Sequence, residues 1–147
     1  MLQTGDAAPD FKMEDADGKS WTLEGLRGQG FVLYFYPADD TSGCTLESCD
    51  FRDADPEFRA AGYLIFGVSP QGAASHQRFA AKYSLNFPLL IDEGGEAAKA
   101  FGAVKDGEKL RIKRSTFVID GQGRIEQALY GVRAKGHVAS LKETLNL

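Results

Sequence analysis

Apolar and polar residues alternate in blocks along the 147-residue chain, and these blocks predict strands and helices in turn. The clearest block is Phe31–Tyr36, a continuous apolar run closed by Pro37, which is typical of a strand buried on both faces. Before it, Phe11–Glu14 and Ser20–Leu23 flank the polar turn Asp15–Gly18. That pattern predicts an N-terminal β-hairpin.

A helical pattern begins at Cys44, after a polar stretch that follows the first long strand. Its apolar residues recur at steps of three and four along one helix face: Phe51, Ala54, Phe58 and Ala61. Pro56 interrupts this pattern, and proline disfavours helical geometry in the residue before it. We therefore expect a kink at Pro56, with Asp55 capping a second, short helix.

The rest of the chain continues the alternation. We expect strands at Tyr63–Val68 and Leu89–Asp92, helices at Ser75–Tyr83 and Glu96–Phe101, a hairpin of Ser115–Asp120 with Arg124–Tyr130, and a terminal helix from Lys135 that turns Val138, Leu141 and Leu145 inward. This order predicts a single α/β domain over residues 1–147, with a mixed central sheet flanked by helices and an N-terminal β-hairpin extension. Ligands of such sheets bind beyond the carboxyl ends of central strands, where Pro37–Cys44 lies.

Composition excludes several classes of function. Hydrophobic residues make up 43% and charged residues 26% of the chain, as in an ordinary globular protein. A net charge of −4 argues against a nucleic-acid partner. The first residues lack a signal-peptide pattern and no apolar run could span a bilayer, so we expect a cytoplasmic protein without membrane contact. Two cysteines in that compartment are more often catalytic, redox-sensing, metal-binding or simply buried than a structural disulfide.

Cys44 is placed in the first turn of the predicted helix, where unpaired backbone N–H groups favour an anion. An ordinary thiol is only a few per cent thiolate at pH 7, and making it mostly thiolate needs about 3.4 kcal/mol. A helix terminus supplies at most about 2 kcal/mol, so we expect a cation to contribute the rest. The alternative is a small buried residue at Cys44, with Thr41 serving as a helix cap.

Cys49 favours the chemical interpretation over the buried one. In a regular helix it lies about 7.5 Å further along the axis than Cys44, rotated by about 140°. The two α-carbons are then farther apart than the roughly 7 Å that a disulfide allows. A Cys44–Cys49 bond therefore requires the first helical turns to unwind. Cys44 shares a helix face with Glu47 and Phe51, whereas Cys49 points elsewhere.

Residues Pro37–Cys44, PADDTSGC, resemble the peroxiredoxin active-site motif Pro-x-x-x-Thr-x-x-Cys. The longer run Phe35–Arg52 resembles the bacterioferritin comigratory protein, or Q-type, branch of that family. The likeness covers nearly the whole chain and includes Phe66–Pro70, Phe87–Leu90 and Arg114–Asp120. It implies a thioredoxin-like fold and a thiol-dependent peroxidase that acts on hydrogen peroxide and organic hydroperoxides. We expect neither a cofactor nor a bound metal.

The resemblance also implies roles for individual residues. Cys44 matches the peroxidatic cysteine, which becomes a sulfenic acid, and Cys49 matches the resolving cysteine, which forms an intramolecular disulfide with it. Thr41 matches the threonine that orients the peroxide. Arg114 matches the arginine that stabilises the thiolate, and so supplies the expected cation. Thioredoxin or a similar dithiol is the implied reductant, and monomer and weak homodimer both remain open.

Three further residues are expected to support the site. Pro37 matches the proline that shields the sulfur, Gly43 adjoins Cys44, and Glu47 aligns with a family glutamate that holds an arginine or the helix. The segment Val104–Lys113 is short beside that of many relatives, which leaves the loop before the arginine undetermined.

Two other functions compete with the peroxidase. A thioredoxin-like disulfide oxidoreductase normally uses Cys-x-x-Cys, whereas this chain has four residues between its cysteines. A copper- or zinc-binding protein would use the cysteine pair with His76 or His137 as a third ligand. A non-catalytic interaction module would leave Thr41, Cys44 and Arg114 unexplained.

The remaining notable residues are expected to be structural. We expect His76 and His137 on the surfaces of their helices, and the aromatic residues Trp21, Tyr34 and Phe35 in the core. Arg52 is expected either near the active site or in an ion pair with one of the acidic residues that follow it, Asp53 or Asp55.

Overall fold

The computed structural model describes residues 1–147. In chain order its elements are β1 (Lys12–Glu14), β2 (Ser20–Thr22), the short 3₁₀ helix η1 (Glu24–Leu26), β3 (Gly30–Phe35), α1 (Ser42–Ala60), β4 (Tyr63–Ser69), α2 (Ala73–Tyr83), β5 (Leu89–Ile91), α3 (Glu96–Phe101), β6 (Ser115–Ile119), β7 (Ile125–Leu129) and α4 (His137–Thr144). None of these helices is both long and apolar enough to cross a membrane.

Five strands form one mixed sheet in the order β5-β4-β3-β6-β7. β3, β4 and β5 run parallel, whereas β6 pairs antiparallel with β3 and β7 pairs antiparallel with β6. β1 and β2 form a separate hairpin before the sheet. The predicted α/β architecture, with a mixed sheet and an N-terminal hairpin, is confirmed.

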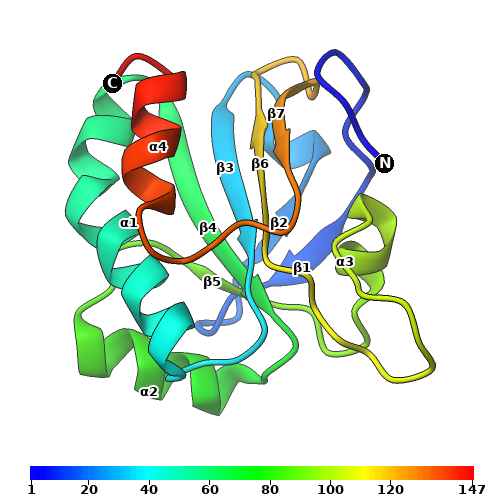
Figure 1. The fold of residues 1–147 in the computed structure, drawn as a ribbon, viewed down its shortest axis with the longest axis vertical. Coiled ribbons are helices and arrows are strands. Elements are labelled where there is room, and N and C mark those ends of the chain that lie inside the picture. The colour runs from blue at the N-terminus through cyan, green and yellow to red at the C-terminus, as the bar shows by residue number, and fades with distance from the viewer.

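The sheet is covered on both faces, with α1, α2 and α4 on one side and α3 with the hairpin on the other (Figure 1). Successive residues of β3 point to opposite faces, and all of them after Gly30 are buried, because this strand lies in the middle of the sheet. Tyr34 faces α1, where its ring stacks on Phe51 with centroids 4.5 Å apart. Phe35 faces α3 and lies 5.6 Å from the ring of Phe101. Tyr34 and Phe35 are thus core residues, as expected.

The register between β3 and β6 determines which loops meet at the lower end of the sheet in Figure 1. Phe35, the last residue of β3, is paired with Ser115, the first residue of β6. The chain leaves β3 towards α1 at the same edge where it enters β6. Arg114 therefore lies next to the loop that leads to Cys44, although seventy positions separate the two residues.

The expected break at Pro56 is wrong, because α1 continues through it as one helix of 19 residues. Pro56 has no N–H to donate to the carbonyl of Arg52, four residues earlier. The side-chain amide of Asn86 donates to that carbonyl instead, at 3.2 Å. Asp55 is a buried helical residue and not a cap, and its carboxylate accepts from Arg59 at 2.9 Å. Ala61, expected on the buried face, is the exposed residue that ends the helix.

Candidate active site

The sulfur of Cys44 lies beneath the first turn of α1 and is almost completely buried, with 1% of the residue exposed. The helix begins at Ser42, so the backbone N–H groups around Cys44 are among those that the helix leaves without partners. Arg114 donates from Nη2 to this sulfur at 3.2 Å. The thiol thus faces a helix N-terminus and a guanidinium, two sources of positive potential that favour a thiolate.

Glu47 holds the other side of the same guanidinium. Arg114 donates from Nη1 to Oε1 of Glu47 at 2.6 Å, and Glu47 is fully buried. Burial raises the pKa of Glu47 to about 7, against the opposing attraction of Arg114. Burial lowers the pKa of Arg114, but the negative partners Glu47 and Cys44 outweigh this and raise it overall. The arginine is therefore permanently charged and is fixed in orientation by two contacts.

Gly43 leaves room for that guanidinium. A β-carbon at this position would lie 3.2 Å from Nη2 of Arg114, which is closer than most side-chain contacts in proteins. Its backbone is helical and not left-handed, so the position requires a small residue for reasons of space rather than of conformation. Gly43 thus allows the arginine to approach the sulfur.

Thr41 and Pro37 lie in the exposed loop between β3 and α1. Thr41 precedes the first helical residue but makes no side-chain cap bond; its hydroxyl donates to the carbonyl of Ala38 at 2.9 Å. The carbonyl of Pro37 accepts from the side chain of Gln71 at 3.2 Å. Both residues flank the approach to Cys44, and the proposed roles in orienting peroxide and shielding the sulfur remain predictions.

Cys49 lies on the same helix as Cys44, and both thiols are free. Cys44 points inwards together with Glu47 and Phe51, whereas Cys49 is only partly buried. Burial raises the pKa of the Cys49 thiol; Arg52 opposes the rise, and the nearby carboxylates of Asp53 and Asp50 add to it. With the helix intact, five positions separate the sulfurs by more than a disulfide can span.

Arg52 lies about one helical turn beyond Cys49 on α1 and links this helix to the end of α2. Its guanidinium pairs with Asp53 at 3.0 Å, one of the two expected acidic partners, and donates to the carbonyl of Tyr83 at 2.7 Å. Together with the bond from Asn86 to the Arg52 carbonyl, this fixes the middle of α1 from both its side chain and its backbone.

The expectation that His137 lies on the surface of its helix is wrong, because this residue of α4 is only 7% exposed. Its Nε2 lies 2.8 Å from the hydroxyl of Thr116 on β6. Burial, together with the positive charge of Arg114, lowers the pKa of His137 to about 4. The ring is therefore neutral at pH 7. His137 is the first residue of α4 and is buried beside Val138; the sequence pattern indicated the burial of Val138 but not that of His137.

His76 is also buried, contrary to the expectation, and has no exposed surface. It lies on α2 three residues before the buried Phe79, so both side chains share the inner helix face. This three-residue spacing from Phe79 is the feature of the sequence that could have indicated that His76 is buried. A polar residue on such a face needs partners from elsewhere in the chain, and His76 finds them in Asp39 and in the carbonyl of Leu90.

The segment Val104–Lys113 forms a closed loop before Arg114. Val104 and Ile112 are joined by an isolated antiparallel bridge, and Lys105 donates to the carbonyl of Arg111 at 2.8 Å. Val132 then donates to the carbonyl of Arg114 itself at 2.9 Å. The short segment thus has a defined conformation, and the backbone carbonyl of Arg114 is held by Val132.

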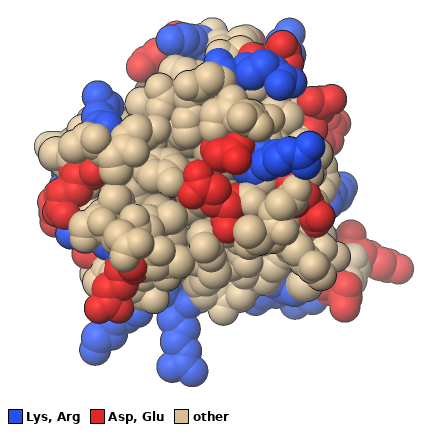
Figure 2. Space-filling model, turned by 90° about the horizontal axis from the view of Figure 1, so that it is seen from above, with Lys and Arg blue, Asp and Glu red and all other residues tan.

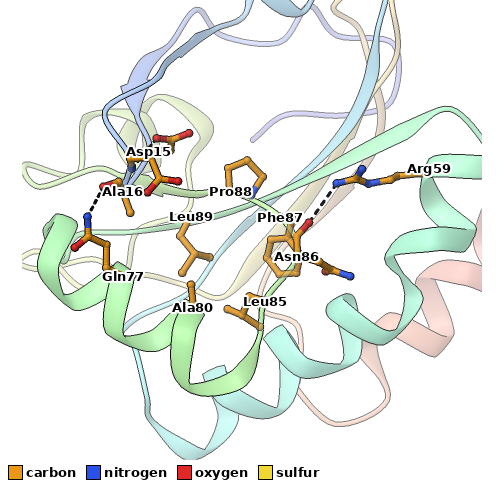
Figure 3. A pocket seen from close by; sticks show the side chains of 11 residues that line it. Asp15, Ala16, Arg59, Gln77, Ala80, Leu85, Asn86, Phe87, Pro88 and Leu89 are labelled. Carbon is orange, nitrogen blue, oxygen red and sulfur yellow. Dashed lines mark hydrogen bonds between the residues drawn. The ribbon is translucent and has the colours of Figure 1, made fainter.

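The best-defined pocket of the molecule lies away from Cys44, Glu47 and Arg114. A pocket of about 450 Å³ lies between the β1–β2 turn, α2 and the chain before β5 (Figure 3), where Gln77 donates to the carbonyl of Ala16 and Arg59 to that of Asn86. None of the candidate site residues lines it. Basic and acidic side chains are interspersed on the face shown in Figure 2. No group of three or more His, Cys, Asp or Glu side chains is arranged to hold a metal ion.

Comparisons with known proteins agree with this geometry. Residues 4–128 match the model of the AhpC/TSA family. The chain is 44% identical to a protein named putative peroxiredoxin bcp from Helicobacter pylori, over 98% of both chains. The crystal structure of a PrxQ mutant from Xylella fastidiosa superimposes with a TM-score of 0.92 at 31% identity, covering 99% of this chain and 96% of that one.

A structure of the Xanthomonas campestris bacterioferritin comigratory protein, from work on its alkyl peroxide reduction, matches with a TM-score of 0.90 at 35% identity, covering 99% of this chain and 96% of the other. The fold is therefore that of the thioredoxin-like peroxiredoxins, as the resemblance implied. The family match over most of the chain, together with close relatives of full length, shows that the chain belongs to the AhpC/TSA family and is a peroxiredoxin of the Bcp/Q branch.

Proposed function

We propose that this peroxiredoxin reduces peroxides with Cys44 and regenerates itself through Cys49. The observation that carries the proposal is the contact of 3.2 Å between the Arg114 guanidinium and the buried sulfur of Cys44 at the start of α1. A fixed positive charge next to a sulfur favours the thiolate, which is the nucleophilic form of cysteine. The same charge can stabilise the negative charge that develops on the peroxide oxygens.

In the first step the thiolate attacks one peroxide oxygen. The S–O bond forms, the O–O bond breaks, and the other oxygen leaves as an alkoxide or hydroxide that takes up a proton. Cys44 becomes a sulfenic acid. Thr41 is proposed to hydrogen-bond the peroxide, since it stands in the loop directly before the helix. Hydrogen peroxide and organic hydroperoxides are both proposed substrates, since the loop that precedes Cys44 is exposed to solvent.

In the second step the thiolate of Cys49 attacks the sulfur of the sulfenic acid. An S–S bond forms and water leaves after protonation. Because both cysteines lie on α1, the first turns of the helix must unwind before the sulfurs meet. Thioredoxin or another dithiol then reduces the disulfide by exchange. A cytoplasmic location, where such dithiols are kept reduced, is part of the proposal.

Peroxide consumption by the reduced protein tests this function. The reduced parent should remove one equivalent of peroxide without a reductant and turn over repeatedly with a thioredoxin system. Cys44→Ser should remove none, whereas Cys49→Ser should remove one equivalent and then accumulate higher oxides that mass spectrometry detects. Peroxide loss at the parent rate in Cys44→Ser would overturn the proposal.

A further inference from the structure

The loop that leads to Cys44 is anchored by a buried, hydrogen-bonded pair of side chains, Asp39 and His76. The Oδ2 atom of Asp39 lies 2.6 Å from Nδ1 of His76, and the exposed fractions of the two side chains are 4% and 0%. Asp39 belongs to the β3–α1 loop, two residues before Thr41, while His76 belongs to α2. The contact therefore ties the loop to a helix that carries none of the proposed catalytic groups.

The hydrogen bonds determine the protonation state of this pair. Burial raises the pKa of Asp39, but hydrogen bonds from His76, Tyr36 and Ser75 outweigh it and lower the pKa overall, so the carboxylate is ionised. Nδ1 of His76 thus faces an acceptor. Its Nε2 lies 2.9 Å from the carbonyl of Leu90, which is also only an acceptor. A neutral imidazole has one N–H, so both contacts are satisfied only by the doubly protonated ring.

Each oxygen of the Asp39 carboxylate has a partner. Tyr36, the residue after β3, donates to Oδ1 at 2.6 Å, and Ser75 donates to Oδ2 at 2.7 Å. The backbone N–H of Asp39 donates to the side chain of Gln71 at 3.0 Å. The side chain and the backbone of Asp39 are therefore held by Tyr36, by α2 and by Gln71 in the loop after β4, which leaves the loop little freedom.

From this geometry we propose that Asp39 and His76 form a positioning pair that sets the peroxide-binding loop relative to the sulfur. The proposal rests on the function proposed above and deepens it. Thr41 and the first helical N–H groups follow Asp39 directly. A displacement of about 1 Å in groups that orient a reactant can lower a rate by about 100-fold. Neither residue of the pair contacts the sulfur, so its effect on the reaction passes through the loop.

The adjacent residue provides an internal comparison. Asp40 also bonds to α2, through Lys82 at 2.8 Å and Tyr83 at 2.7 Å. This second pair is exposed, with 57% of the Lys82 side chain and 43% of the Asp40 side chain open to solvent. Exposed ion pairs contribute little to holding a structure in place, whereas buried and fully bonded ones constrain it. Lys82→Met is thus a matched control for His76.

The test compares two reactions of Cys44. Peroxide reduction requires the loop to orient the peroxide, whereas alkylation by iodoacetamide reports the reactivity of the same buried sulfur without a bound peroxide. His76→Phe, which keeps the ring volume, should lower the second-order rate with hydrogen peroxide by about 10- to 100-fold and change the alkylation rate by less than about 3-fold. Lys82→Met should change neither rate by more than about 2-fold.

Asp39→Asn serves as the conservative rescue. Its amide can donate to Ser75 and to a neutral His76 protonated at Nε2, so every hydrogen bond of the network persists with two directions reversed. This variant should keep the peroxide rate within about 3-fold of the parent, whereas Asp39→Ala should lose about as much as His76→Phe.

Nitrogen-15 NMR of His76 gives a readout that needs no activity. The parent and Cys44→Ser should both show an imidazolium with two slowly exchanging N–H protons, and Asp39→Asn should show the neutral Nε2–H form. A neutral His76 in the parent, or equal losses of peroxide and alkylation rates in His76→Phe, would overturn the positioning pair. Absence of peroxide reduction in the parent would instead refute the proposed function.

Discussion

The Nη2 atom of Arg114 lies 3.2 Å from the sulfur of Cys44, and its Nη1 atom lies 2.6 Å from a carboxylate oxygen of Glu47. One planar guanidinium thus bridges a nucleophile and a buried acid in a fixed orientation. Lysine has a single charged nitrogen and cannot make both contacts in the same geometry.

We expect Arg114→Lys to lower the second-order rate of peroxide reduction by about 100-fold, because a single ammonium cannot donate to the Cys44 sulfur while it is also held by Glu47. The measurement is stopped-flow consumption of hydrogen peroxide by the reduced protein. Arg111→Lys is the control, since the side chain of this exposed arginine in the preceding loop hydrogen-bonds only to the carbonyl of Asp106. Equal rates in Arg114→Lys and the parent would contradict a direct role of the guanidinium.

Gly43→Ala should separate stability from activity. Alanine favours helical backbone by up to about 1 kcal/mol over glycine, so the free energy of unfolding should stay constant or rise. Its β-carbon would lie 3.2 Å from Nη2 of Arg114 and push the guanidinium away from the sulfur. We expect the peroxide rate to fall by about 10-fold while urea denaturation shows no loss of stability. Loss of stability in parallel with the rate would indicate a folding defect instead.

Asn86 should matter for stability because of Pro56. Removing its amide in Asn86→Ala leaves the carbonyl of Arg52 without a partner and should lower the free energy of unfolding by about 1 kcal/mol. Pro56→Ala restores a helical N–H to that carbonyl, so the Asn86→Ala change should cost less in the Pro56→Ala background. A double-mutant cycle in urea measures this coupling. Strictly additive effects would show that Asn86 does not replace the missing helical bond.

Glu47 and His137 should give opposite pH dependences of stability. The folded pKa of Glu47 is raised from 4.5 to about 7, so its contribution is present below the unfolded pKa and is lost as pH rises towards 7. The folded pKa of His137 is lowered from 6.5 to about 4, so its contribution is present above pH 6.5 and is lost as pH falls towards 4. Between these limits the two effects oppose each other.

Glu47→Gln should therefore expose the acid sensitivity due to His137. Relative to the parent, this variant should lose on the order of 2 kcal/mol when the pH falls from about 7 to about 4.5. The measurement is urea denaturation over this pH range at constant ionic strength, with His137→Asn expected to change the slope in the opposite direction. Parallel stability curves for Glu47→Gln and the parent would show that Glu47 is ionised throughout.

Much of the fold could be predicted because its elements are determined locally. The apolar run Phe31–Tyr36 has no alternative to a central strand, and the helical spacing of Phe51 and Phe58 identifies one face of α1. The sequence motif also indicated which residues gather at the site, and the register of Phe35 with Ser115 explains how Arg114 reaches it.

What the sequence could not predict depends on partners that are distant along the chain. His76 is read as a surface residue until Asp39 and Leu90 are known to surround it, and both lie at least fourteen positions away. Pro56 predicts a break until Asn86 is seen to take over the helical hydrogen bond. In each case a polar group contradicts its local pattern because a group from another element satisfies it.

Both ends of the segment that must unwind are fastened to α2, at Asp39 through His76 and at Arg52 through the carbonyl of Tyr83. A segment with fixed ends gains less conformational entropy on melting than a free segment of the same length. We therefore expect the reduced enzyme to remain in its helical form until the sulfenic acid exists. A reductant would then recognise the oxidised protein by a change confined to this short stretch of an otherwise constant surface.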